Sequence, residues 1–258
     1  MLRSIKELKG YAIKAKDGDI GRVEDFYFDD ERWVVRYMVT DIGSWMQGKS
    51  VLVSTAAFFG QANWDKKEFP VSLTRNMVAN CPDIDLHKPV VRQKEEELNA
   101  YYKWPVYWQI AAATDGITPS MPFVGPPEEV IRSKEKADLH LRSFAEIAGY
   151  NIRAREGDIG HVEDLIVDDK RWNIAYMIVN THVWMPNGRV IVALNWIKNI
   201  SWEKAEVVVD LSREQIKASP QYDPSNGVNR DFEDKLYDYY GRPKYWTPAL
   251  VPTGIKKD

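Results

Sequence analysis

A mostly β fold, built from two small antiparallel β-barrels in tandem, is predicted by three observations. The sequence repeats itself after 139 residues, each copy contains six short strand-like stretches, and turn-forming residues stand at the junctions between them. A closed barrel is favoured because an open sheet of this size would leave its edge strands exposed. Each barrel is expected to be followed by a short helix and by an aromatic helical tail.

The repeat determines the predicted domain organisation. Leu2–Met38 aligns without gaps to Leu141–Met177, and 21 of these 37 positions are identical. After Val53 the shift falls to 138, and the match continues to two similar tails, Tyr101–Trp108 and Tyr239–Trp246. Self-similarity of this kind indicates a duplicated domain. We therefore predict a first domain at 1–108, a proline-rich and charged linker at 109–139, a second domain at 140–246 and a C-terminal tail at 247–258.

The expected strands are apolar or alternating runs bounded by turn residues. In the first copy they cover residues 10–16, 21–28, 33–42, 50–54, 58–64 and 68–73, and in the second 151–155, 160–167, 172–180, 189–193, 196–202 and 205–211. Thr74 and Ser212 are the expected N-caps of a short helix, which ends before Pro82 and Pro220. Helices at 95–102 and 231–240 are expected in the tails.

The stretch Lys16–Trp33, which returns as Arg155–Trp172, is acidic and contains two glycines in each copy. Its first glycine suits the left-handed backbone of a hairpin turn, and its second permits close approach or a bulge. The aspartate that follows is expected to accept backbone N–H bonds from the neighbouring turn. We interpret the stretch as the first hairpin of a barrel, with structural roles for Gly18, Gly21, Asp25, Gly157, Gly160 and Asp164.

The acids of this stretch do not fit a calcium loop. Counting from Asp17, position six is Arg22 where such a loop has glycine, and position twelve is Phe28 where it has a bidentate acid. Cys81 is the only cysteine, so an intrachain disulfide is excluded and a cysteine-based zinc site is not supported. No metal site and no cofactor are predicted.

Common catalytic motifs are absent from the sequence. There is no Cys–His pair, no H-E-x-x-H helix, no G-x-S-x-G elbow and no phosphate-binding glycine loop. The four histidines are His87, His140, His161 and His182, and only His161 lies in the repeated stretch. We expect the protein not to be an enzyme, and an active site in a pocket between the barrels is the alternative left open.

The charge balance and the hydropathy pattern limit the class of partner. The formal charge is −3, with 35 basic and 38 acidic residues, which argues against nucleic acid as a partner. No run approaches the roughly 18 apolar residues of a membrane span, and the first residues lack the apolar region of a signal peptide. We expect a cytoplasmic protein that reaches a membrane only through a partner.

Aromatic residues are the most informative candidates for function. Trp33/Trp172 and the pair Trp64/Trp202 recur at strand ends, where we expect them to pack in the core. A Trp-Met pair in the loop after the long strand either caps the barrel mouth or contacts a partner. The tails cannot bury their rings alone, so each is expected to dock on a barrel; docking on the opposite one would make an internal pseudo-dimer, and a homo-oligomer is the alternative. The candidate partner contacts are Trp45, Met46, Trp184, Met185, Tyr107, Trp108, Tyr245 and Trp246.

The order of motifs resembles the PRC-barrel family. A short strand is followed by D-G-x-I-G-x-V-x-D, an apolar strand, D-D, W, a long strand and, in the first copy, a T-R-x-x-V helix. The family is named after the cytoplasmic domain of the H subunit of purple-bacterial photosynthetic reaction centres. The resemblance covers about 80 residues in each copy, and the tails resemble those of an uncharacterised bacterial subgroup. It implies the barrel fold and not a particular activity.

The favoured function is a non-catalytic protein-interaction or scaffolding module with an unknown protein partner. Two similar faces at a fixed separation raise avidity for a repeated or symmetric partner. The resemblance implies one alternative, an accessory or assembly protein of a photosynthetic reaction centre or another membrane electron-transfer complex. Because the same barrel occurs in a ribosome-maturation factor, an RNA-processing or ribosome-associated role is a second alternative.

Overall fold

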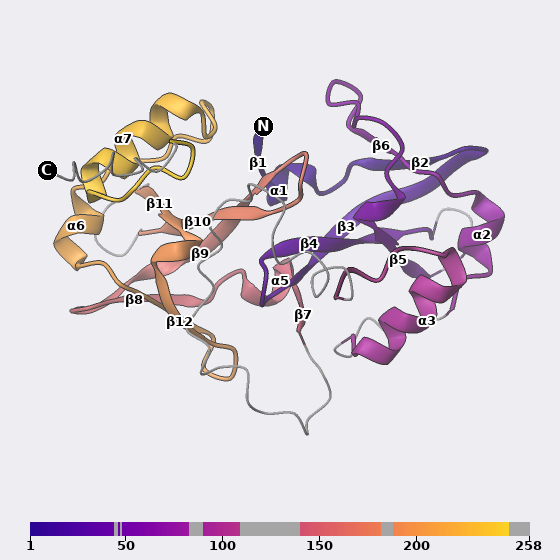
Figure 1. Ribbon diagram of the computed structural model, residues 1–258, viewed down its shortest axis with the longest axis horizontal. Helices are drawn as coiled ribbons and strands as arrows, with labels where there is room; N and C mark the ends of the chain where they lie inside the picture. The colour runs from indigo at the N-terminus through magenta and orange to yellow at the C-terminus, as the bar shows by residue number, and fades with distance from the viewer. Residues whose placement is uncertain (44–45, 47, 83–89, 109–139, 182–187, 248–258) are drawn as a thin grey trace, which may run out of the picture.

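The computed structural model describes residues 1–43, 46, 48–82, 90–108, 140–181 and 188–247, and arranges them around two β-sheets with few helices (Figure 1). The predicted β-rich fold is confirmed. One contiguous core of buried apolar side chains contains residues of both repeats. Below, the first repeat means residues 1–108 and the second repeat means residues 140–247.

Sheet 1 holds five strands of the first repeat, in the order β5-β4-β3-β2-β6. Most neighbouring strands are antiparallel, but β6 runs parallel to β2. It pairs with the edge of β2 that does not face β3. The strands are β2 (Ala12–Ala15), β3 (Gly18–Asp29), β4 (Val34–Asp41), β5 (Ser50–Ser54) and β6 (Glu68–Pro70).

Sheet 2 repeats this arrangement in the second repeat, in the order β11-β10-β9-β8-β13-β12. Here too one neighbouring pair is parallel, β8 with β13, so the all-antiparallel expectation is wrong for one pair in each sheet. The strands are β8 (Asn151–Ala154), β9 (Gly157–Asp168), β10 (Ile174–Asn180), β11 (Arg189–Ala193), β12 (Ile197–Ser201) and β13 (Glu206–Val209).

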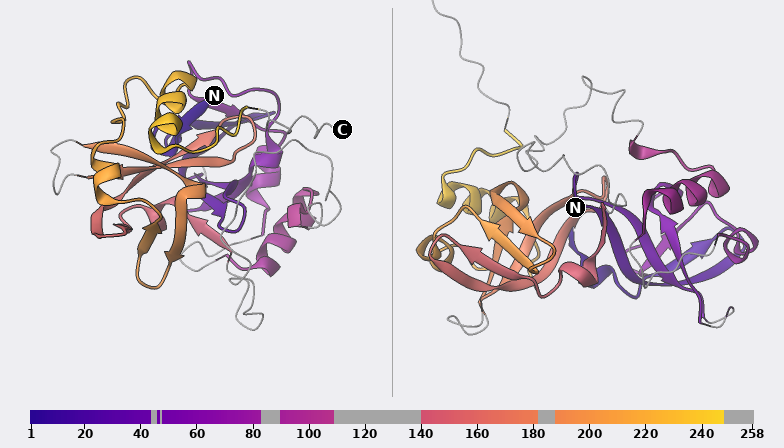
Figure 2. Two further views of the ribbon diagram at one scale, coloured as in Figure 1. Left: turned by 60° about the vertical axis from the view of Figure 1, so that its left-hand side comes forward. Right: turned by 90° about the horizontal axis from the view of Figure 1, so that it is seen from below.

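Each sheet is completed by a short strand from the other repeat. In sheet 1, β2 pairs only with the first part of β3, and β7 (Leu141–Ser143) of the second repeat pairs with the last part. In sheet 2, β1 (Leu2–Ser4) of the first repeat pairs in the same way with the last part of β9. The right-hand view of Figure 2 shows the two sheets meeting near the N-terminus. The repeats therefore exchange their first strands.

Short helices follow the exchanged strands and the sheets. The predicted N-caps are confirmed, since the Thr74 and Ser212 side chains accept from the backbone N–H groups of Met77 and Gln215. The tail helices α3 and α7 lie on the same side of the molecule in the right-hand view of Figure 2. The α-helices are α1 (Ile5–Leu8), α2 (Arg75–Ala79), α3 (Arg92–Tyr102), α5 (Phe144–Ile147), α6 (Arg213–Lys217) and α7 (Arg230–Tyr240), and the 3₁₀ turns are η1 (Thr55–Ala57) and η3 (Leu194–Trp196).

The strand expected at residues 58–64 is wrong for the first repeat. Only two isolated bridges form there, Phe58 with Val71 and Asn63 with Glu68. Gly60 adopts a φ of 79°, which interrupts an extended backbone. The second repeat has a lysine at the aligned position, inside β12, and its backbone stays extended.

Candidate functional site

Two equivalent contact regions join the repeats, and we call them the exchange sites. In the first exchange site β7 lies on β3, and in the second β1 lies on β9. Each site combines the strand ladder with a carboxylate at the start of a short helix and with an arginine held between an aspartate and an indole ring. The acidic stretch that recurs in the sequence supplies these carboxylates.

The aspartate in the middle of each long strand receives the short helix of the other repeat. Asp164 accepts hydrogen bonds from the Ser4 hydroxyl and from the backbone N–H of Lys6, the latter at 3.2 Å. Asp25 accepts from the backbone N–H of Ala145 at 3.3 Å. These donors belong to the first turns of α1 and α5, where N–H groups have no partner within the helix. The expected donor, the neighbouring turn, is therefore wrong for both residues.

Burial raises the pKa of the Asp25 and Asp164 carboxyl groups. Hydrogen bonds to each carboxylate oppose this shift, since they favour the charged form. Two effects therefore oppose one another at each carboxyl group. Burial disfavours the charged form, and hydrogen bonds, including those from the other repeat, favour it.

In the first exchange site, a second aspartate binds an arginine of the second repeat. The Arg142 Nε atom donates to Asp30 Oδ2 at 3.1 Å, and the guanidinium carbon lies 4.4 Å from the centre of the Trp202 ring. Burial raises the pKa of Asp30 to about 6, although Arg142 opposes this shift. The arginine thus contacts a carboxylate of the first repeat and an indole of its own repeat.

The second exchange site repeats this arrangement with the roles of the repeats reversed. Arg3 Nε donates to Asp169 Oδ2 at 2.8 Å, and its guanidinium carbon lies 3.5 Å from the centre of the Trp64 ring. A cation over an indole face adds attraction to the ion pair. The second aspartate of each D-D dipeptide therefore binds the arginine of the other repeat's L-R-S segment, and the recurring tryptophan, Trp64 or Trp202, binds the arginine of its own repeat.

Trp33 and Trp172 also connect the repeats. Both have left-handed backbones, with φ of 54° and 63°, which is rare for a bulky residue. The carbonyl of Trp172 accepts from the Val35 N–H at 2.8 Å, and that of Trp33 accepts from Ile174 at 2.7 Å. The Trp172 ring lies among three phenylalanines of the first repeat, Phe26, Phe58 and Phe69, at centroid distances of 5.1 to 6.1 Å. Both rings are buried as expected, but the core around Trp172 belongs to the other repeat, whereas Trp33 stacks on Phe28 of its own repeat at 5.1 Å.

The predicted hairpin glycines lie where the chain turns or is crowded. Gly18 and Gly157, with φ of 141° and 127°, begin the long strands after the turn. At Gly21 a Cβ would stand 1.8 Å from a backbone carbonyl oxygen of β4, and at Gly160 1.9 Å from one of β10. Any side chain at these two positions would push the neighbouring strand away.

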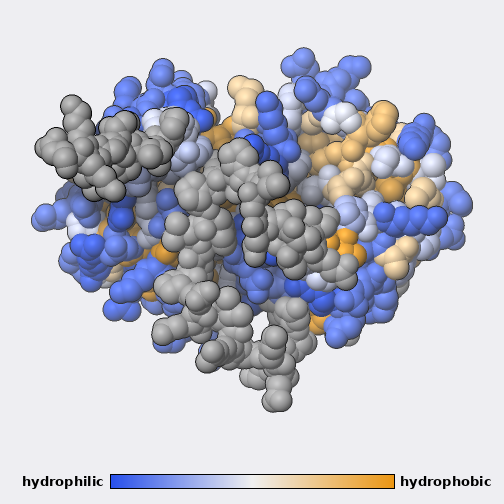
Figure 3. Space-filling view, in the orientation of Figure 1, coloured by the Kyte–Doolittle hydropathy of each residue, from blue (hydrophilic) through white to orange (hydrophobic). Residues whose placement is uncertain are grey.

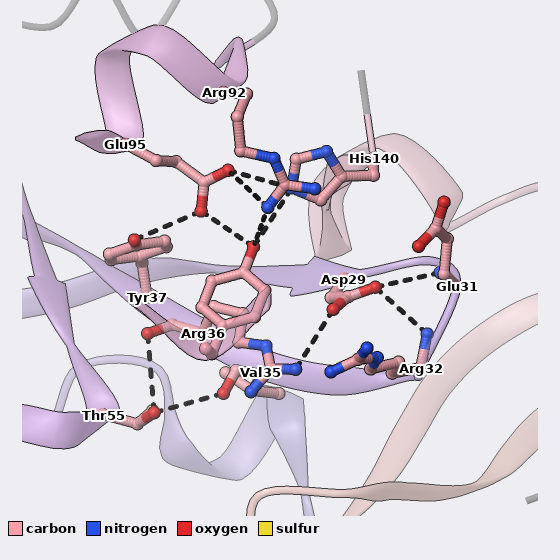
Figure 4. A network of polar contacts seen from close by, with 11 residues as sticks. Asp29, Glu31, Arg32, Val35, Arg36, Tyr37, Thr55, Arg92, Glu95 and His140 are labelled. Atoms are coloured by element: carbon pink, nitrogen blue, oxygen red, sulfur yellow. Dashed lines mark hydrogen bonds and ion pairs between the residues drawn. The ribbon is translucent and has the colours of Figure 1, made fainter. Parts of the chain in front are cut away.

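The first aromatic tail docks through a buried carboxylate, Glu95 of α3 (Figure 4). The hydroxyl of Tyr107 donates to Glu95 at 2.8 Å and that of Tyr37 at 3.2 Å. His140, which precedes β7, brings its Nε2 atom within 2.9 Å of Glu95 Oε1 and 3.0 Å of the Tyr107 hydroxyl. We call this group the first tail cluster. It joins a sheet strand, the tail helix and the start of the second repeat.

The second tail cluster is built in the same way around Glu233 of α7. Tyr176 donates to Glu233 at 2.5 Å, Tyr245 donates at 2.7 Å, and Arg230 forms an ion pair at 2.9 Å. In the alignment Met1 takes the place of His140, so this cluster lacks the histidine. Arg92 lies 3.7 Å from Glu95 in the first cluster, so the carboxylate, the two tyrosines and the arginine are the shared part of both clusters.

The last aromatic residues of each tail pack on their own tail helix. Trp108 lies against the Arg92 guanidinium at 4.2 Å, and Trp246 against Arg230 at 4.2 Å. Trp246 also contacts Tyr237 edge-on at 5.0 Å. The tails therefore dock, but docking on the opposite barrel is wrong. Four of the candidate partner contacts from the sequence, the Tyr-Trp pairs of the two tails, have contacts within the chain.

The carboxylates at the centres of the tail clusters are buried. Burial and the neighbouring Glu95 charge raise the pKa of Tyr37 and Tyr107 well above the usual range, so both hydroxyls stay protonated and donate. His140 is only 4% exposed and Glu95 is fully buried. Buried and paired polar groups of this kind can fix how segments pack.

The other candidates from the sequence contribute less. Met46 is half-buried and packs against the core. Trp45, Trp184 and Met185 lie outside the described residues, as do two of the four histidines. His161 is exposed on β9. Sequence reasoning missed the arginines and Ser4 of the exchanged segments, although the identical L-R-S at the start of both copies was a usable signal.

The remaining described surface includes a shallow depression and exposed apolar side chains. Within the described ranges, no group of three histidine, cysteine, aspartate or glutamate side chains is placed to hold a metal, and no helix is long and apolar enough to cross a membrane. A shallow depression of about 480 Å³ on sheet 2 is lined by charged side chains, including the Arg155–Asp210 ion pair. Phe59 is 69% exposed, and apolar surface gathers over the region of β6 in Figure 3.

No family model matches the chain, and a search of curated proteins finds no match.

Proposed function

We propose that the chain is a non-catalytic scaffold of two PRC-barrel-like units, which holds two similar faces at a fixed separation for a protein partner. The observation that carries this proposal is the reciprocal exchange of first strands, because it fixes the orientation of one repeat on the other. Two flexibly linked domains would not need an aspartate–arginine–indole contact in each direction.

Barrel closure belongs to the same proposal. Each long strand has twelve residues and carries two register shifts against its neighbour, which bend it strongly. A bent strand that pairs with three others is typical of small barrels, in which one strand serves both walls. Gly21 and Gly160 of the D-G-x-I-G-x-V-x-D motif lie at a further register shift, where each long strand pairs with the preceding hairpin strand.

A binding role is supported over catalysis by how the polar groups are used. The tail clusters hold segments of the chain together, and their carboxylates and His140 are buried. The tail helices of the two repeats lie on the same side of the molecule (Figure 2), so the repeats have a fixed, related orientation. A partner with two copies of a motif can then contact both faces at once.

We propose the Trp-Met pairs of the two loops as the partner contacts, Trp45 with Met46 and Trp184 with Met185. The test compares the wild-type chain with the Trp45→Ser/Trp184→Ser variant in affinity capture with quantitative mass spectrometry. The matched control is Phe59→Ser, which removes an exposed aromatic ring of the described surface. We expect specific partners to be lost from the double variant and kept by the control. Equal recovery with all three proteins would contradict the assignment.

The single variants test the use of two faces. If both faces bind one partner, Trp45→Ser alone should weaken capture by about a hundredfold or more, because avidity is lost. Additive and small losses from the two single variants would mean that the faces act independently, and the scaffold proposal would then fail.

A further inference from the structure

The two repeats are connected covalently only through residues 109–139, and their non-covalent contacts are reciprocal. The exchange sites pair Arg142 with Asp30 and Arg3 with Asp169, and in each pair the partners come from different repeats. None of these contacts requires that both repeats belong to the same chain. The linker alone decides which copy supplies the partner.

The described residues that flank the linker segment contact one another. The Tyr107 hydroxyl is 3.0 Å from His140 Nε2, so the chain leaves the first repeat and enters the second at the same place. An intervening segment of 31 residues is far longer than this gap requires, since an extended chain spans about 3.3 Å per residue. The segment can therefore reach a repeat that is packed on another molecule.

We propose that a second copy of this chain can take the place of either repeat, giving a closed dimer in which the first repeat of each chain packs on the second repeat of the other. Both exchange sites and the first tail cluster form in this dimer as they do in the single chain. The backbone within a repeat does not change, because the hinge lies in the linker. The dimer is closed by a two-fold axis and does not grow into a fibre.

The linker sets the balance between the two forms. The contacts are identical, so the single chain is favoured only by the effective concentration of the tethered repeats, about millimolar for a flexible linker. We expect the wild-type chain to be monomeric at micromolar concentration, with dimer appearing as the concentration approaches millimolar. A substitution that makes the contact between the repeats unfavourable within one chain, but not between two chains with complementary substitutions, shifts the balance to the dimer.

The Asp30–Arg142 pair allows such a change. The side chains are 14% and 18% exposed, and their contact distance is 3.1 Å. The Asp30→Arg chain has two arginines facing each other, and the Arg142→Glu chain has two acids. In an exchanged dimer of these two variants, one junction has the native Asp–Arg pair and the other has the reversed Arg–Glu pair. Both like-charge contacts are thus relieved in the mixed dimer alone.

The experiment uses full-length chains at about pH 8, where Asp30 is ionised. The two variants are mixed in denaturant, refolded together, and measured by size-exclusion chromatography with light scattering. We expect a species of twice 29.8 kDa with one copy of each variant. Its dissociation constant should be about a thousandfold lower than that of the wild-type dimer, since two unfavourable charge contacts are removed.

The Asp30→Arg/Arg142→Glu double variant is the matched control, because its reversed pair forms within one chain. It should remain at 29.8 kDa, like the wild type. If the mixture of single variants also stays at 29.8 kDa, or if a single variant dimerises equally well without the other, the proposal is overturned. If the single variants fold only when mixed, the proposal is supported. Arg3→Glu with Asp169→Arg repeats the test at the second exchange site.

Discussion

Removing the Trp172 ring should destabilise the first repeat, although the residue belongs to the second. The Trp172 ring is 7% exposed and lies among Phe26, Phe58 and Phe69. Trp172→Ala therefore leaves a cavity in the core that packs on sheet 1. A buried tryptophan removes about 200 Å² from water, worth roughly 5 kcal/mol at 25 cal/mol per Å². Measured truncations of buried aromatic residues cost about 3–5 kcal/mol, in agreement. We expect a loss of this size in the free energy of unfolding.

The backbone of Trp172 gives a second, independent expectation. Its φ of 63° is strained for alanine and relaxed for glycine. Trp172→Gly should therefore be more stable than Trp172→Ala by about 0.5–1 kcal/mol, whereas at ordinary positions the glycine variant is the less stable of the two. The hydrogen bond from the Val35 N–H to its carbonyl remains available in both variants.

Hydrogen exchange measured by mass spectrometry locates the effect. In Trp172→Ala, peptides that cover β3 and β6 should lose protection as much as those that cover β9 and β10. Trp246→Ala is the control, because that ring packs on its own tail helix and should leave sheet 1 unchanged. If the loss of protection is confined to the second repeat, the reasoning about the exchanged cores is refuted.

Three further predictions concern the polar contacts. The folded-state pKa of Asp30, about 6, lies above its unfolded value, so the stability that Asp30 contributes is present below about pH 4 and is lost as the pH rises through 6. In urea unfolding, the stability advantage of the wild type over Asp30→Asn should fall by up to about 3 kcal/mol from pH 4 to 7. A constant difference would contradict the shift. Tyr245→Phe should cost about 1–3 kcal/mol, since Glu233 loses a donor, and the equally aromatic Tyr239→Phe, whose ring is exposed, should cost under 1 kcal/mol; similar melting temperatures of the two would refute tail docking through the carboxylate. Gly160→Ala should destabilise by more than about 1 kcal/mol in thermal unfolding, because its Cβ meets a carbonyl oxygen in addition to the strain of a positive φ. Gly227→Ala, which also has a positive φ but open space around it, should cost less because it carries the backbone strain alone.

Local structure was largely predictable because it depends on local sequence. The hairpin at Gly18, the N-caps Thr74 and Ser212 and the tail helices all follow from turn, capping and periodicity rules, and the structure places them as expected. Gly60 is the exception: it was read as part of a strand, but its positive φ ends the extended backbone there.

The exchange was not predictable from these rules. Alternation and turn chemistry indicate that Leu2–Ser4 and Leu141–Ser143 are extended, but they do not say which copy each strand joins. Because the copies are nearly identical at these positions, pairing within a repeat and pairing between repeats have the same sequence pattern. Asp25 was therefore assigned a partner in the neighbouring turn, when the partner is Ala145 of the other repeat. Likewise, the tail carboxylates were hidden because Glu95 appears as an ordinary helical surface residue.

The central claim, that the repeats hold one another through exchanged strands, is tested most directly by cutting the linker. A protease site placed within residues 109–139 of the full-length chain is cleaved after folding, and the product is examined by size-exclusion chromatography with light scattering. The account predicts that both fragments elute together with a mass near 29.8 kDa, and that their melting temperature rises with protein concentration. Two folded fragments that elute separately at micromolar concentration would contradict it.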